Sequence, residues 1–591
     1  MRFEGAALRQ LLLMILAVGA GLSVIGATSA TPGARPLPAW LGSKGPVEVQ
    51  GERKPPVSRE VSDGRFATSW LCEMCHSNAA TSIAMLDEKK RFVGPFTLWQ
   101  GSMMANSARD PFWRAAVSAE VKVLPMHKAT IEATCMKCHA PMAMAEAHLN
   151  GEKAPGIHLL TEDTNRGQLA IDGVSCTLCH QIRPDGLGTD ASYTAGFVIG
   201  DKKEIFGPHK DPLADPMVRM SAFTPVAATH MTQSKLCATC HTVITEGRNL
   251  KGEVVREHFA EQSPYFEWRN SVFNTELDKP GPDAADCQSC HMPLTSEDGV
   301  PIKTRLARTP NGRTYDAPLR EPFGRHLFVG GNTLIPAILR DNADELRPLA
   351  SREAFDFTIQ AARDQLQQST ARLGISGPAR SNGKVTFGVK LENLTGHKFP
   401  SAYPSRRAWL RVRLLDAKGS VLWASGESDL EGRIIGTDGK PLPSELQGGL
   451  VMPHRAKITQ PDQVQVYETI MADSDGKAVF RLMLACGRFK DNRLLPRGWT
   501  ADGMHVEDTR PIGVEGDTDF AGGGDEVAFE IAVADDCAEV EVTLLYQTLA
   551  ARYAAELFAF DTPEIKRFRG YYEKAARGPE EVASAKVKVP K

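Results

Sequence analysis

The sequence predicts a mixed α+β protein, in which a loop-rich, mainly helical part precedes an antiparallel, β-sandwich-like part. Three observations predict this order. Ten of the 12 cysteines fall in one repeated five-residue pattern between residues 72 and 291. An apolar stripe with helical spacing follows, formed by Phe355, Ile359, Ala362 and Leu366. Beyond residue 377, apolar and polar residues alternate in short runs separated by turn residues, which is typical of half-buried strands.

Length and composition exclude several classes of protein. The chain has 591 residues, more than one ordinary domain, and its 42% of hydrophobic residues can fill sizeable cores. Its formal net charge is -3, without the basic excess of a nucleic-acid-binding protein. The sequence also contains neither a Walker loop nor a convincing dinucleotide fingerprint. We therefore expect no nucleic-acid partner and no nucleotide cofactor.

The N-terminus has the pattern of an export signal. Arg2 and Arg9 precede an apolar run over residues 11–26, and small residues lead to Ala30. This pattern predicts a signal peptide at residues 1–30 and export of the protein to the periplasm. An extracellular location is the alternative destination. A retained membrane anchor is the alternative, although the run is short for a bilayer span. No later stretch is long enough, so we expect no transmembrane span in the mature chain.

The repeated cysteine pattern is C-x-x-C-H, which attaches c-type haem. Two thiols separated by two residues bond to the two vinyl groups of the porphyrin, and the adjacent histidine ligates the iron from the proximal side. The pattern predicts five covalent haems held by Cys72, Cys75 and His76; Cys135, Cys138 and His139; Cys176, Cys179 and His180; Cys237, Cys240 and His241; and Cys287, Cys290 and His291.

Two alternatives use the same cysteines. Cysteine pairs at this spacing also bind zinc, and cysteines of an exported protein form disulfides. Neither explains why a histidine follows the second cysteine in every copy of the pattern. The haem interpretation does, because each iron needs a proximal nitrogen ligand. The export signal agrees with it, since bacterial haem attachment takes place outside the cytoplasmic membrane.

The expected organisation follows from these features. Residues 31–65 are rich in proline and charge and predict an extended lead-in, and residues 66–350 form the pentahaem cytochrome c domain. A helix that starts with Asp110 as its cap is the clearest element there. A linking helix covers residues 351–376 and is stopped by Gly374. A β-sandwich-like domain covers residues 377–550, and residues 551–591 form a C-terminal helix and a tail that frays from Glu580.

The clearest strands of the β-domain are predicted from alternation at residues 385–391, 410–414, 480–486, 529–533 and 540–546. Cys486 and Cys537 are the cysteines outside the haem motifs. In an exported β-domain they predict a stabilising disulfide bond, with a redox-active thiol pair as the alternative. Asp517, Asp519 and Asp525 lie in a glycine-rich loop. They offer calcium ligands, and a plain turn is the simpler interpretation.

The second axial ligand of each iron decides what that haem does. Two strong ligands make an electron-transfer haem, whereas an open face lets a substrate bind. His230 precedes Cys237 by seven residues, His326 is flanked by glycines, and His397 lies at the end of a strand. Met104 offers a thioether. Each of these residues also has a purely structural interpretation. The histidines could be hydrogen-bonded at the surface or an interface, and Met104 could pack in the core. Four candidate distal ligands for five haems leave one iron open.

The chain resembles the multihaem cytochromes c related to the tetrahaem electron acceptor of hydroxylamine oxidoreductase. The matching segments together run from about residue 66 to residue 550, and they are Trp99 to Pro111, Asp172 to His180, His230 to His241, Glu261 to Trp268, Cys287 to Pro293 and Thr395 to Pro400. In that family a distal histidine often lies in a Trp-x-x-Ser-x-His pattern. Here Met104 occupies the position of that histidine, which implies His/Met ligation or an altered haem site.

The resemblance implies a cofactor role rather than a particular substrate. It agrees with an exported protein that carries electrons between soluble or membrane-bound redox partners through five haems. The alternative is a multihaem oxidoreductase that acts on a small nitrogen or sulfur compound at a haem with an open distal face. We expect an electron-transfer protein more than a substrate-converting enzyme, and no catalytic residue stands out.

Overall fold

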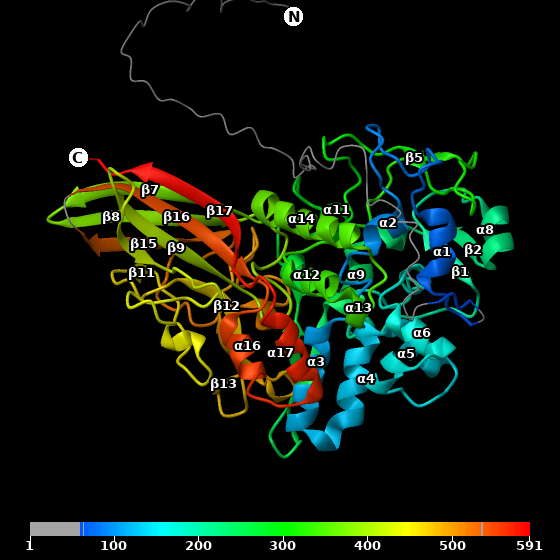
Figure 1. Cartoon of the computed structure of the whole chain (residues 1–591), viewed down its shortest axis with the longest axis horizontal. Coiled ribbons are helices and arrows are strands. Elements are labelled where there is room, and N and C mark those ends of the chain that lie inside the picture. The colour runs from blue at the N-terminus through cyan, green and yellow to red at the C-terminus, as the bar shows by residue number, and fades with distance from the viewer. Residues whose placement is uncertain (1–58, 63, 534–535, 591) are drawn as a thin grey trace, which may run out of the picture. The chain divides into compact units, whose positions relative to one another are not determined.

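The computed structural model describes residues 59–62, 64–533 and 536–590 (Figure 1). These residues all belong to one compact unit, Ala34–Lys591. The predicted signal peptide and most of the predicted lead-in lie outside the described residues. Among the helices that are described, none combines the length and the apolar character needed to cross a membrane.

The first part of the described chain is mainly helical. Its three two-stranded sheets pair β1 with β2, β3 with β4 and β5 with β6, over Glu204–Gly207, Thr224–Ala227, Val243–Arg248, Val254–Gln262, Thr304–Arg305 and Leu319–Arg320. Its helices α1 to α14 span Ser69–His76, Pro95–Trp99, Pro111–Val123, Lys128–His139, Pro141–Leu149, Asn165–Ile171, Cys176–Cys179, Ala214–Ser221, Ser234–His241, Pro264–Arg269, Cys287–His291, Leu334–Asp341, Ala343–Leu346 and Arg352–Ser369.

Two predicted helices are present. Helix α3 begins after Asp110, whose side chain accepts hydrogen bonds from the first free backbone N–H groups of the helix. Helix α14 is capped by Ser351 in the same way. It ends at Ser369, however, and Gly374 lies within the next strand rather than stopping the helix. The predicted end of this helix was therefore wrong.

The second part consists mainly of two antiparallel sheets. One has the order β13-β12-β9-β16-β17, with β10 beside β9 and β14 beside β12, and the other has the order β11-β15-β8-β7, in which the short pair β11 and β15 is parallel. The strands β7 to β17 span Ala371–Ser381, Lys384–Asn393, Arg407–Asp416, Val421–Ser425, Lys457–Ile458, Val466–Ala472, Ala478–Val479, Gly487–Asp491, Gly524–Ala532, Cys537–Gln547 and Glu580–Lys588.

Alternation along the strands builds a single core between these sheets. The inward residues of β8 and β15 in one sheet and of β9 and β16 in the other are almost fully buried and belong to one apolar cluster. This is how two amphipathic sheets remove their apolar faces from water. The chain is thus mixed α+β, as predicted.

The strand predicted at residues 480–486 is wrong. Residues Leu482–Leu484 form a 3₁₀ turn between the short strand β13 and β14. The buried carboxylate of Glu120 accepts hydrogen bonds from the backbone N–H groups of Leu482 (2.8 Å) and Met483 (3.2 Å). Because these donors are bonded to a side chain of the helical part, they are not part of a β-ladder.

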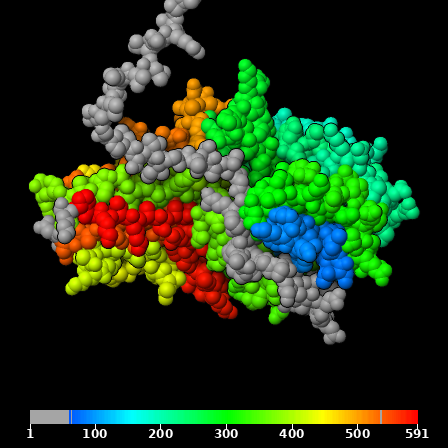
Figure 2. Space-filling view, turned by 90° about the horizontal axis from the view of Figure 1, so that it is seen from above, coloured from blue at the N-terminus to red at the C-terminus, as the bar shows by residue number. Residues whose placement is uncertain are grey.

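The C-terminal tail is more ordered than predicted. Helices α16 (Ala551–Leu557) and α17 (Pro563–Tyr572) agree with the predicted C-terminal helix. The residues from Glu580 form strand β17, which pairs with β16 along its whole length and contacts β7. Figure 2 shows β17, in red, along the surface beside the yellow-green strands. Ion pairs of its lysines with Glu539 and Glu541 flank this pairing.

The predicted disulfide between Cys486 and Cys537 is wrong, because both are free thiols. Cys537 lies opposite Asp416 at one end of β9. The backbone N–H of Cys486 donates to the carbonyl of Ala472. On β12, Ala472 lies beyond the opposite end of β9. Each residue advances a strand by about 3.3 Å, so two cysteines at opposite ends of β9 lie more than about 30 Å apart. A disulfide requires Cα atoms within about 7 Å.

Two free thiols should therefore be found per chain once the protein is unfolded without reductant, because covalent haem would occupy the other cysteines. Alkylation with iodoacetamide in denaturant, followed by intact mass measurement, counts them. Cys537→Ser should lower the count by one thiol and leave the melting temperature insensitive to reductant. A wild-type chain that takes up no alkyl group before reduction would contradict the separation of these cysteines.

Candidate haem sites

Each of the five C-x-x-C-H motifs contains a helical turn, in α1, α4, α7, α9 and α11. On a helix, residues three apart lie on one face, so both thiols of a motif are presented on the same side. None of the ten motif cysteines forms a disulfide. The local structure therefore favours bonding both cysteines of a motif to a single planar group.

Four of the motif histidines are held by backbone carbonyls at Nδ1. A ligating histidine usually donates its second ring N–H in this way, which fixes the ring and leaves Nε2 for the metal. The bonds join His76 to Leu306 (3.1 Å), His139 to Ser107 (3.0 Å), His180 to Phe206 (2.6 Å) and His291 to Val329 (2.8 Å).

All five motif imidazoles are kept neutral by burial. Desolvation lowers the pKa of His139 and of His291 to about 4, and it also lowers the pKa of His76, His180 and His241. An imidazole binds a metal only through an unprotonated nitrogen. Burial therefore keeps these rings available as ligands at neutral pH.

Two of the predicted distal histidines lie opposite motif histidines. The rings of His180 and His326 have centroids 6.3 Å apart and planes within 19°, and those of His291 and His397 have centroids 6.4 Å apart and planes within 14°. Two imidazoles that bind one metal from opposite sides, through bonds of about 2.0–2.1 Å, have ring centroids about 6.3 Å apart. Both pairs fit an iron between them.

Hydrogen bonds at the two opposing rings agree with this geometry. Nδ1 of His326 lies 3.1 Å from the carbonyl of Gly324, and Nδ1 of His397 lies 2.9 Å from the carbonyl of Lys398. Their Nε2 atoms are then the nitrogens left for a metal. Burial lowers the pKa of His326 to about 3 and also lowers the pKa of His397, so both rings are neutral.

The other two predicted distal ligands have different surroundings. His230 is buried, and its Nε2 lies 2.8 Å from the carbonyl of Ile182, so Nδ1 is its remaining nitrogen. Met104 is half-buried, and its backbone carbonyl accepts hydrogen bonds from Val174 (3.0 Å) and Ser107 (3.4 Å). Neither residue is paired with a motif histidine by a ring contact in the described chain.

Contacts between thiols bring different motifs together. Hydrogen bonding with Cys176 raises the pKa of Cys72 well above its ordinary value. The same effect acts on Cys240 through Cys138 and on Cys237 through Cys287. The first motif thus lies beside the third, and the fourth lies beside both the second and the fifth. Groups attached to these cysteines would be close neighbours.

A buried ion cluster holds the loop that carries His397. Lys398 and Asp491 are fully buried and joined at 2.7 Å, and Arg493 binds both Asp491 (2.7 Å) and Glu267 of α10 (3.1 Å). The Glu267 carboxylate also accepts the Lys398 N–H (3.0 Å). These opposite charges hold the pKa of Asp491 and of Glu267 below their usual ranges, against the effect of burial. The cluster joins a helix of the motif-bearing part to the residue next to His397.

Sequence reasoning missed several residues around these sites. Trp113 stacks on the ring of His139, with centroids 4.3 Å apart and planes within 3°. Its place in the helix that Asp110 caps was visible in the sequence, but its partner was not. The carbonyls that bind Nδ1 carry no sequence signal at all, since every residue has a carbonyl.

Comparisons with known proteins add little to this geometry. No family model matches the chain, and no curated protein sequence matches it. It is similar to a solved structure described as a penta-heme cytochrome c552 from Thermochromatium tepidum, with 17% identity and a TM-score of 0.47, over 90% of this chain and 100% of that one. At 17% identity and a TM-score of 0.47, the likeness does not by itself define the cofactors of this chain.

Glu267→Gln should destabilise the protein by about 3 kcal/mol, because it removes one partner of a buried charge cluster and leaves the others uncompensated. Chemical unfolding of the wild type and the variant measures the loss. Glu257→Gln, at an exposed position of β4, is the matched control and should change stability by less than about 0.5 kcal/mol. Equal stability of the wild type and Glu267→Gln would contradict the importance of the cluster.

Proposed function

We propose that this chain is an exported multihaem cytochrome c, which carries electrons through five covalently attached haems between redox partners. The repeated C-x-x-C-H motif supports covalent attachment at five places. The single observation that carries the proposal is the pairing of His180 with His326 and of His291 with His397, at centroid distances of 6.3 and 6.4 Å. Two histidines across an iron are the ligand set of an electron-transfer haem.

The chain's own residues have defined roles in this proposal. The motif cysteines would attach each porphyrin, and the motif histidines would ligate the iron, with backbone carbonyls at Nδ1 fixing the rings of four of them. His326 and His397 fill the opposite side of two irons, and His230 and Met104 are proposed for two others. The haem supplies one-electron redox chemistry when bound. Because the sulfur atoms of these neighbouring motifs lie close together, haems attached to them would be adjacent, and electrons would pass between them.

A second candidate function rests on the remaining motif histidines. In the described chain, ring contacts pair His180 and His291 with a second histidine, but not His76, His139 or His241. Four distal candidates for five haems leave one iron with an open face. Such a haem would support an oxidoreductase that acts on a small nitrogen or sulfur compound. Export to the periplasm belongs to both proposals, and it is motivated by residues 1–30.

The proposal is tested first by the haem count and the spin states. Intact mass of the chain, produced with haem-maturation machinery, should exceed the mass of the polypeptide by five haems. Low-temperature EPR of the oxidised protein then counts low-spin and high-spin ferric haems. Five low-spin signals favour the electron carrier, and one high-spin signal favours the oxidoreductase. A mass without covalent haem ends both proposals.

Substitution of the two paired distal histidines tests the ligand assignment. His326→Ala and His397→Ala should each convert one low-spin haem to a high-spin one and leave the mass increment of five haems unchanged. His258→Ala is the control, because this histidine is half-exposed and is bound to Asp508 (3.2 Å) rather than to a motif. Unaltered EPR and absorption spectra of both variants would contradict their role as axial ligands.

A further inference from the structure

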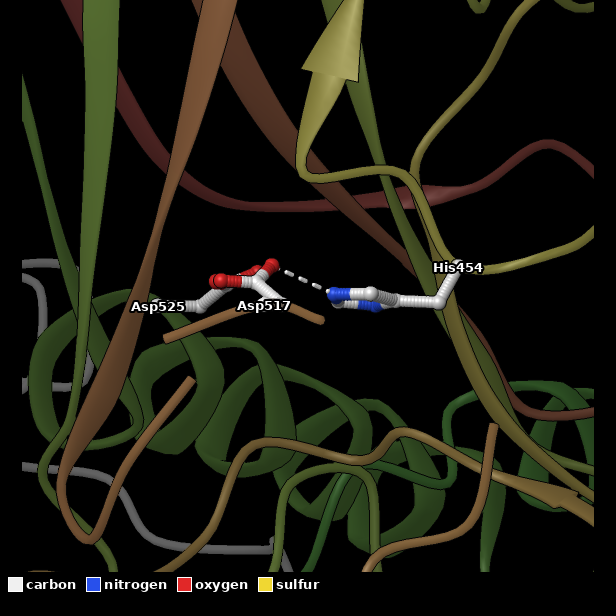
Figure 3. Close-up of side chains that lie close together, drawn as sticks. All are labelled: His454, Asp517 and Asp525. Carbon is white, nitrogen blue, oxygen red and sulfur yellow. Dashed lines mark hydrogen bonds and ion pairs between the residues drawn. The ribbon is translucent and has the colours of Figure 1, made fainter. Parts of the chain in front are cut away.

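A compact group of ligand-type side chains lies in the β-sheet part, away from the cysteine motifs. One ligand atom from each of His454, Asp517 and Asp525 falls within 4.8 Å of the others. Asp517 and Asp519 come from the loop before β15, and Asp525 lies near the start of that strand. Figure 3 shows the carboxylates of Asp517 and Asp525 side by side, with the ring of His454 hydrogen-bonded to Asp517.

The negative charge of this group is not compensated by the described residues. The side chain of Asp517 is 3% exposed, and Asp525 is also 3% exposed. The ion pairs of the described chain include no lysine or arginine bound to either carboxylate. Two buried carboxylates with oxygen atoms within 4.8 Å of each other favour either a proton on one of them or a bound cation.

One oxygen atom points directly to a missing ligand. Oδ2 of Asp525 accepts a hydrogen bond from the hydroxyl of Tyr467 at 2.6 Å, whereas its Oδ1 is buried without a partner. Buried carboxylate oxygens are almost always satisfied in native proteins, and an orphan needs an explanation such as a bound ion.

The hydrogen bonds of His454 determine which of its ring nitrogens carries the proton. Its Nδ1 lies 2.8 Å from Nε2 of Gln465 and 3.1 Å from Nδ2 of Asn492, and both of these are amide N–H donors. The amide orientations are determined in turn, because Gln465 Oε1 accepts the Arg455 N–H and Asn492 Nδ2 donates to the Val466 carbonyl. Nδ1 is therefore an acceptor, and the ring carries its proton on Nε2.

The tautomer decides the chemistry of the site. Nε2–H of His454 donates to Oδ2 of Asp517 at 2.8 Å, so this nitrogen is a hydrogen-bond donor rather than a metal ligand. The atoms left for a cation are carboxylate oxygens. Oxygen ligands select hard cations such as Ca²⁺, whereas zinc and copper favour nitrogen or sulfur.

We propose that Asp517, Asp519 and Asp525 bind one hard divalent cation of the Ca²⁺ class, with His454 as a positioning residue for Asp517. Asp519 is exposed, and its carboxyl lies within hydrogen-bonding reach of Asp517 but outside the close group of His454, Asp517 and Asp525, so we assign it as the outer ligand of the site. Water completes the coordination, as is usual for Ca²⁺. This site is independent of the haem proposal.

The cation would stabilise the sheet that leads to His397. Asp525 pairs with Leu391 on β8, and Asn393 at the end of β8 donates its side-chain N–H to the carbonyl of His397 at 2.8 Å. Within this loop, Asp517 accepts the Asp519 N–H (3.3 Å) and Asp519 accepts the Glu526 N–H of β15 (3.1 Å), and a cation held by Asp517 and Asp525 would add a further link between the loop and this strand. Binding would therefore raise the stability of the β-sheet part.

The test measures bound metal and thermal stability on the full haem-loaded chain. After dialysis against Ca²⁺ and removal of the excess, elemental analysis should find about one calcium per chain, and EGTA should remove it. Addition of 1 mM Ca²⁺ to the EGTA-treated protein should raise the melting temperature by about 2–4 °C. Asp519→Asn and Asp525→Asn should abolish both effects.

Asp475→Asn is the matched control, because Asp475 lies in an exposed aspartate-containing turn and pairs only with exposed Lys477 (3.6 Å). It should bind calcium and respond as the wild type does. The exposed position of Asp519 makes its variant a test that does not depend on core folding. A wild type without bound calcium and without a melting shift would overturn the proposal. So would a shift that persists in Asp519→Asn, or a site that binds Zn²⁺ through His454 and ignores Ca²⁺.

Discussion

The buried cluster of Glu267, Lys398, Asp491 and Arg493 is the interaction on which the arrangement of the proposed haem sites depends. Glu267 lies on α10 between two motif helices, whereas the other members lie in the β-sheet part. Desolvation of four charges is expensive and is offset only when every member is paired. The cluster therefore favours one relative placement of α10 and the loop after β8, and His397 is the residue beside it.

This constraint gives the β-sheet part a role at one of the proposed haem sites. In the haem proposal, a motif supplies its own thiols and proximal histidine, and the second ligand of each iron comes from elsewhere in the chain. His326 comes from the loop after β6, within the motif-bearing part, whereas His397 comes from the loop after β8, in the β-sheet part, and each lies opposite a motif histidine. The two sheets of the second part share one apolar core, which gives the His397 loop a rigid support. Rigid support of this kind is needed because axial ligation tolerates little displacement.

The sequence predicted what is local and missed what depends on distant contacts. The chemistry of the C-x-x-C-H motif can be predicted from five consecutive residues, and the cap of α3 can be predicted from Asp110 and its neighbours. The turn at Leu482 looked like a strand because its apolar spacing alternates, and Glu120, 362 residues earlier, overrides that pattern. The carbonyl of Leu306 that holds His76 is 230 residues away from it. Such partners become visible only in the folded chain.

The incorrect disulfide prediction has the same cause, because the distance between two strand ends is not visible in the sequence. Two unassigned cysteines in one predicted β-domain favoured a bond, yet register places Cys537 at one end of β9 and Cys486 past the other. The sheets do not need that covalent link, because other contacts hold their loops. Asn393 fixes the loop of His397 through three backbone carbonyls, His454 fixes Asp517 in the loop before β15, and Tyr467 fixes Asp525 at the start of that strand. Noncovalent polar contacts buried at strand ends thus define the position of the loop that carries His397, and their loss would displace His397 without breaking a covalent bond.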